Sequence, residues 1–154
     1  LGHARLCEVD REAFDAQLPA LREEFGDRAV LRCIHYWHEN ALVDERWRQL
    51  NIGDMQAFLE LTRQSGASSA MFLQNVVASL GREQPAMYAL GLAEHVLRGR
   101  GAARIHGGGF GGTIQAFVPL ELADEFQAKM DAWLGEDACR RYRVTDEGAY
   151  AAWL

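Results

Sequence analysis

The stretch that decides the fold is AARIHGGGFGGTIQAFVP, residues 102–119, in which glycine fills five of six consecutive positions and only Phe110 interrupts the run. The flanking residues are short, partly β-branched and roughly alternating between apolar and polar types, which is typical of strands. The stretch therefore predicts two strands joined by a glycine loop. An ordinary hairpin turn needs only one or two glycines, so five exceed what a turn alone demands.

The glycine loop does not match either common phosphate motif. Gly107, Gly109 and Gly112 satisfy G-x-G-x-x-G, but a dinucleotide-binding loop is followed by a helix, and here the pattern after the loop is that of a strand. A Walker A loop needs Lys-Ser or Lys-Thr after the glycines, and the one lysine, Lys129, lies far downstream. Bare backbone can still present several N–H groups to an anion, so phosphate binding and a tight structural connection both remain open.

The segments around this stretch predict an α+β fold. Apolar residues spaced by three and four predict helices over residues 14–25, with a break at Pro19, over 28–50, from Asp54, from Pro85 and over 122–133. Residues 65–81 read as a loop and a shorter helix, and residues 140–145 and 149–154 read as final strands. Together these elements predict a small antiparallel sheet with helices packed on it.

The predicted helix over residues 28–50 carries two apolar stripes on different faces. A helix of this kind is typically wedged between neighbours. The stripes are Val30, Ile34, Trp37 and Ala41 on one face, and Val43, Trp47 and Leu50 on the other.

Composition limits the class of protein. The 154 residues fit one domain, and the net charge of −6 argues against nucleic acid or an anionic membrane as the main partner. Three widely spaced cysteines form neither a disulfide framework nor a Cys-x-x-Cys metal pair, so we expect reduced thiols in a cytoplasmic protein. The sequence contains no run long enough to span a membrane and no signal-peptide pattern at its start.

Four motifs occur in an order that resembles the GHMP small-molecule kinases, and within them the galactokinases. The glycine loop within GAARIHGGGFGGTIQAFV resembles the third GHMP motif, Gly-Ala-Arg and two residues before Gly-Gly/Ala-Gly-Phe-Gly-Gly, with one extra alanine here. Upstream, RCIHYWHENALV, LNIGDMQAFLEL and SGASS are similar to the galactokinase succession Arg-x-x-His-x-x-x-Glu-Asn, Leu-x-x-Gly-Asp-x-x-x-Phe and Ser-His-x-Ser. The order and spacing agree over roughly residues 32–118, most of the chain.

The resemblance implies a fold and a set of site residues. It implies that residues 1–154 are one domain, the ferredoxin-like C-terminal domain of a GHMP kinase with extra helices, which closes one side of the active-site cleft. The glycines then lie near the phosphates and support the ATP-binding loop, and Phe110 is expected to be packed. This role falls to Gly107, Gly108, Gly109, Gly111 and Gly112. Arg104, which holds the family's Gly-Ala-Arg position, and Ser65 and Ser68, which match its serines, are candidates for shaping the cleft.

The resemblance also implies what the chain lacks. The family's sugar-binding motif, its Pro-x-x-x-Gly-Leu-Ser-Ser-Ser phosphate loop and its catalytic carboxylate belong to an N-terminal half, and none occurs here. We therefore expect no catalytic residue and no metal ligand in this chain, and no activity from it alone. The expected partners are the missing N-terminal domain of the same polypeptide, ATP with Mg²⁺, and a sugar such as galactose.

Two departures and two alternatives stay open. The family's Ser-His-x-Ser-Leu is Ser65-Gly66-Ala67-Ser68-Ser69 here, and its Asp-Tyr-Glu-Val-Ser falls in MFLQNV, so the resemblance indicates a sugar kinase without fixing the sugar. A galactokinase-like sensor that binds sugar and nucleotide without turnover is one alternative, and a stand-alone interaction domain is another.

His35, His38 and Glu39 share one helix face and could bind zinc, but no metalloprotease pattern fits, and packing residues on a scaffold helix are the favoured interpretation.

Overall fold

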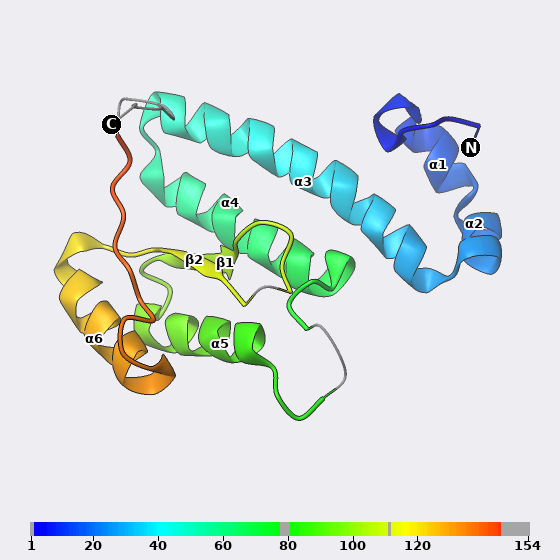
Figure 1. The fold of residues 1–154 in the computed structure, drawn as a ribbon. Coiled ribbons are helices and arrows are strands. Elements are labelled where there is room, and N and C mark those ends of the chain that lie inside the picture. Colours follow the sequence, from blue (N-terminus) through cyan, green and yellow to red (C-terminus); the bar gives the residue numbers. More distant parts are fainter. Residues whose placement is uncertain (1, 78–80, 111, 146–154) are drawn as a thin grey trace, which may run out of the picture.

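The computed structural model describes residues 2–77, 81–110 and 112–145. Short helices begin the chain, followed by two long ones, a π-helical turn, a further helix, a two-stranded sheet and a last helix (Figure 1). The elements are α1 (Arg11–Ala16), α2 (Leu18–Phe25), α3 (Asp27–Ile52), α4 (Met55–Ser68), the π-helical turn Ser69–Leu73, α5 (Pro85–Leu97), β1 (Ala102–Ile105), β2 (Ile114–Phe117) and α6 (Ala123–Leu134). Single 3-10 turns occur at Leu6–Glu8 and Leu120–Leu122.

Helices α3 and α4 form an antiparallel pair with a sharp turn between them (Figure 1). Gly53 ends α3 in the left-handed conformation with a φ of 77°, which glycine adopts without strain. Asp54 then caps α4, because its side chain accepts a hydrogen bond from the backbone N–H of Ala57 at 2.9 Å. This turn returns α4 along α3 and so places the serines of α4 against α3.

The sheet lies between this helical pair and helices α5 and α6 (Figure 1). Strands β1 and β2 pair antiparallel, with Ile105 opposite Ile114 at the end nearest the glycine loop. One face of β1 contacts α4, and the main core forms where α5 and α6 meet the sheet. That core contains Ala93, Val96, Leu97, Ala103, Leu122, Phe126 and Met130.

The α+β class and most of the predicted elements are confirmed. The break at Pro19, the cap at Asp54 and the two strands around the glycine loop occur as expected. None of the helices in the described part of the chain is both long and apolar enough to cross a membrane.

Three local predictions are wrong. Residues 65–68 are not a loop, because α4 continues through Ser68 and its serine hydroxyls hydrogen-bond to side chains of α3. Residues 140–145 form no strand: Val144 is 99% exposed, and the segment does not pair with the sheet. The second stripe of α3 is not buried between neighbours, because Val43, Trp47 and Leu50 are all exposed. The other predicted final strand, residues 149–154, lies outside the described residues.

Candidate functional site

The glycine loop connects β1 to β2 and is closed at its base by a backbone hydrogen bond from His106 N–H to the carbonyl of Thr113, at 3.1 Å. Among the described loop residues, Gly107, Gly109, Phe110 and Gly112 all have positive φ, between 59° and 79°. Such values are costly for most side chains and free for glycine. The left-handed backbone therefore accounts for the glycine at three of these positions, and Gly111 lies outside the described residues.

Gly109 has a second constraint, because it packs directly on the backbone of Asn75. A Cβ atom added to Gly109 would lie 2.3 Å from the Asn75 carbonyl oxygen and 2.8 Å from the Asn75 Cβ, closer than real Cβ contacts. Only glycine allows this approach without moving the loop or Asn75. The loop is thus seated on the segment that follows α4.

Gly108 differs from the other described glycines of the loop. Its φ lies outside the left-handed region, and an added Cβ would meet no atom of the described residues within 4 Å. The described residues therefore give neither a conformational nor a steric reason for glycine here.

Phe110 contradicts the expectation that it is packed. Its side chain is 51% exposed, and its backbone N–H donates to the carbonyl of Asn75 at 3.2 Å. The backbone of Phe110 thus anchors the loop while its ring faces outward.

A charged network lies at the base of the same hairpin, where α3, α4 and β1 meet. The Glu39 carboxylate on α3 accepts hydrogen bonds from Ser65 Oγ at 2.6 and 2.7 Å, from Arg46 Nη2 at 3.1 Å and from Arg104 Nη1 at 3.2 Å. The side chains of Glu39 and Arg104 are each 19% exposed. A charge that is this far from water needs such partners, so Glu39 ties β1 and α4 to α3.

His35 and Ser68 extend the contact between α3 and α4 one turn further. His35 Nδ1 and Ser68 Oγ lie 2.9 Å apart, and Ser68 is buried. Burial lowers the pKa of His35 below its ordinary value of 6.5, and the positive charge of Arg104 lowers it further, while Glu39 opposes the shift. The neutral imidazole is therefore the form that the folded chain prefers.

The structure thus brings together three residues that the sequence singled out, Arg104, Ser65 and Ser68. Both serines are buried and face α3, so they hold the scaffold together instead of lining an open surface. Glu39, which belongs to the Arg-x-x-His-x-x-x-Glu-Asn motif and was considered in the sequence as a zinc ligand or packing residue, is the centre of the network. Among the described residues, no group of three or more His, Cys, Asp and Glu side chains is placed to hold a metal ion.

Gly66, which stands where the galactokinase pattern has histidine, lies in a close contact. A Cβ on Gly66 would lie 3.1 Å from the carbonyl oxygen of Ala103 and 3.3 Å from the Cβ of Arg104, tighter than most real contacts. Helix α4 therefore packs closely against β1 at this position, next to Arg104. The departure from the galactokinase pattern coincides with this close packing of helix and strand.

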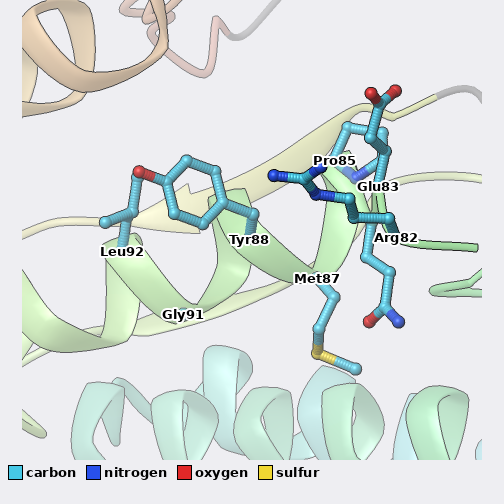
Figure 2. Close-up of a pocket in the computed structure, with 8 residues that line it drawn as sticks. Arg82, Glu83, Pro85, Met87, Tyr88, Gly91 and Leu92 are labelled. Atoms are coloured by element: carbon cyan, nitrogen blue, oxygen red, sulfur yellow. The ribbon is translucent and has the colours of Figure 1, made fainter.

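Two surface cavities lie near α5, and neither is lined by a residue of the glycine loop. The larger, about 890 Å³, follows residues 82–85 and the exposed side of α5, where Met87, Tyr88 and Leu92 line it (Figure 2). The smaller, about 270 Å³, lies between α4, α5 and β1 and is lined by Gly66 and Arg104 among others. Gly107 and Gly108 are exposed, and the described loop residues line neither cavity.

Comparison with known proteins finds similarity to a galactokinase. A galactokinase from Mannheimia succiniciproducens is 34% identical to this chain over 127 residues, which is 80% of this chain and 30% of that protein. The chain spans about a third of the length of this curated relative. No protein-family model matches. Over most of its length the chain is therefore related to part of a galactokinase.

Replacing Glu39 by glutamine tests whether its charge supports the scaffold. We expect Glu39→Gln to lower the free energy of unfolding by about 2–3 kcal/mol, because two poorly exposed guanidinium groups lose their counter-charge. Glu45→Gln, on the same helix but pairing with the exposed Arg48, is the matched control and should cost less than about 1 kcal/mol. Urea unfolding measures both, and equal losses in the two variants would contradict the role given to Glu39.

The lowered pKa of His35 predicts how stability changes with pH. At His35, the unfolded chain binds a proton near pH 6.5, whereas the folded chain binds one only at lower pH. The stability that neutral His35 contributes is therefore fully present above about pH 6.5 and is lost as the pH falls below that value toward the lowered pKa. We expect His35→Gln to lose less stability than the parent chain between pH 7.5 and 5.5, as measured by thermal unfolding. His3→Gln, at an exposed position, should follow the parent, and a His35 variant with the parent's pH profile would refute the assignment.

Proposed function

We propose that this chain is the C-terminal domain of an ATP-dependent sugar kinase of galactokinase type, which transfers the γ-phosphoryl group of ATP to a sugar hydroxyl such as that on C1 of galactose. The observation that carries the proposal is the 34% identity to a galactokinase over 127 residues, together with a glycine loop whose Gly108 faces open space. In this proposal residues 1–154 form one domain, and the loop approaches the nucleotide phosphates.

An exposed apolar stripe supports a larger parent protein. Val43, Trp47 and Leu50 follow one another at helical spacing along α3, and Trp47 is 68% exposed. Ile52 and Met55 continue the apolar surface at the turn into α4. Apolar surface of this kind on one helix face is typical of a site that another domain or partner covers. The stripe favours a domain that works as part of a longer polypeptide over a stand-alone one.

Each described group would have a limited role in such an enzyme. Phosphoryl transfer relies on positioning and charge stabilisation, which loop N–H groups can supply to phosphate oxygens. The Glu39–Arg104 pair would hold β1, and with it the start of the loop, in place. Mg²⁺ would neutralise the developing charge on the phosphates. In this proposal its ligands come from the nucleotide and the N-terminal half.

The departure at Gly66 lies on the scaffold side of this site. Gly66 sits against β1, between two serines that face α3, so this change acts on how α4 supports the hairpin. We therefore propose a sugar kinase whose acceptor is galactose or a related sugar, with the acceptor selected by residues of the N-terminal half.

The proposal is tested first on the native gene product. We expect an antibody against this domain to detect a polypeptide much heavier than 17.2 kDa, which carries the N-terminal half. The purified full-length protein should then consume ATP in a Mg²⁺- and sugar-dependent manner in a coupled ADP assay, and the isolated 154-residue chain should not. A native product near 17.2 kDa would refute the kinase proposal, and a long protein that binds sugar and ATP without turnover would establish the sensor alternative.

Gly108→Ala tests whether the loop approaches a phosphate. The added methyl group meets nothing in the described chain and needs no left-handed backbone, so thermal stability should not change. In the full-length enzyme we expect the KM for ATP to rise about tenfold, equivalent to about 1.4 kcal/mol of lost binding.

Gly91→Ala is the matched control, because Gly91 lies in α5 with equally open space around it. This variant should bind ATP like the parent. An unchanged KM for ATP in Gly108→Ala would remove the loop from the nucleotide site.

A further inference from the structure

Asn75 lies where the chain leaves the π-helical turn and meets the glycine loop. Gln74 ends the turn in the left-handed conformation, with a φ of 58° and a ψ of 41°, and this reverses the chain toward the hairpin. Asn75 follows at 2% exposed. It falls in the segment that departs from the galactokinase pattern, and the proposed function gives it no role so far.

Asn75 contacts three consecutive residues of the loop. Its Nδ2 donates to the carbonyl of Gly108 at 3.3 Å, and its own carbonyl accepts from the N–H of Phe110 at 3.2 Å. Between these two bonds, the backbone of Gly109 packs so closely that a Cβ would overlap the Asn75 carbonyl. One residue therefore fixes the orientation of successive peptide groups in the loop.

Stability does not account for asparagine at this position. Asn75 Oδ1 is buried and has no hydrogen-bond partner in the described part of the chain, and a buried unpaired acceptor is destabilising. An apolar side chain of similar shape would avoid that penalty. A chain with that apolar side chain would lose only the bond from residue 75 to the carbonyl of Gly108. Gly108 is exposed, so water can take over this bond. The contacts of Asn75 with the loop offer another reason for asparagine, a role in the site.

A glycine-rich loop needs such a support if it binds an anion. Free glycines sample many backbone conformations, so ordering them on a ligand is costly unless the loop is held beforehand. The Asn75 side chain supplies this order through its bond to Gly108, and its backbone adds the bond from Phe110 and the close contact with Gly109. As a neutral group, the side chain adds no charge that would repel phosphate. An aspartate in its place would hold a similar shape but would lack the donor.

We propose that Asn75 is the positioning residue of the glycine loop, which it holds so that the N–H groups around Gly107 and Gly108 converge on the oxygens of a polyphosphate. The inference rests on the proposed function for the identity of the anion as the phosphates of ATP. Asn75 itself touches the loop and not the phosphates, so it is not a catalytic residue.

The test replaces Asn75 by leucine and titrates the 154-residue chain with inorganic tripolyphosphate, while the amide resonances of Gly107, Gly108 and Gly109 are followed by NMR. In the parent chain these resonances should shift with saturation at millimolar probe. In Asn75→Leu we expect an affinity at least fivefold weaker with a thermal midpoint equal to or above that of the parent. A merely structural role would predict the opposite pattern, a lower midpoint and unchanged affinity.

Gln127→Leu is the matched control. Gln127 also donates a side-chain amide hydrogen to a backbone carbonyl, that of Cys139 at 3.0 Å, but it lies on α6, outside the loop. This variant should bind tripolyphosphate like the parent. Equal affinity in Asn75→Leu and Gln127→Leu, or no response of the loop resonances in the parent chain, would overturn the inference.

The full-length protein separates this inference from the proposed function. If it phosphorylates a sugar, Asn75→Leu should raise the KM for ATP about fivefold while the KM for the sugar stays unchanged. If it phosphorylates no sugar although its loop binds tripolyphosphate in an Asn75-dependent manner, the kinase proposal fails and the inference about Asn75 stands.

Discussion

The carboxylate of Glu39 accepts hydrogen bonds from its own helix, from α4 and from β1, the strand that leads into the glycine loop. Two guanidinium groups and one hydroxyl converge on it in a region with little exposure to water. The desolvation of an ion pair in such a place offsets much of its attraction, so the pair is weak evidence for net stability. The hydrogen bonds show that α4 and β1 are both joined to α3 through one carboxylate.

The Glu39–Arg104 bond supports the strand that leads into the loop, and Asn75 supports the middle of the loop. Arg104 is bonded to Glu39 only three residues before Gly107, so the start of the loop is held in place relative to α3. Asn75 leaves the end of the α4 segment and binds the middle of the loop. Both supports originate on the α3–α4 pair. A change in how α3 and α4 pack would therefore move both Arg104 and Asn75. Substitutions in residues 65–76 would in this way shift the loop without touching a ligand.

The sequence predicts those parts of the fold whose signals are local. Periodic apolar residues locate the helices, Pro19 and Asp54 mark boundaries, and alternation around the glycines locates both strands. The errors arise where non-local partners decide. Residues 65–68 have the composition of a loop, but their hydroxyls are satisfied by His35 and Glu39, about thirty residues away, and this allows the helix to continue. Residues 140–145 have strand composition but no neighbouring strand to pair with in the described sheet.

The candidate site shows the same division. The glycine loop and Arg104 are visible in the sequence because they form a motif, whereas Asn75 carries no sequence signal, since its role depends on a contact with the loop more than thirty residues away. The loop glycines are also not equivalent. Left-handed backbone requires Gly107 and Gly112, contact with Asn75 adds to that requirement at Gly109, and neither reason applies to Gly108. In the proposed function, the missing Cβ of Gly108 would leave room for the nucleotide phosphates, against a loop that Glu39 and Asn75 support.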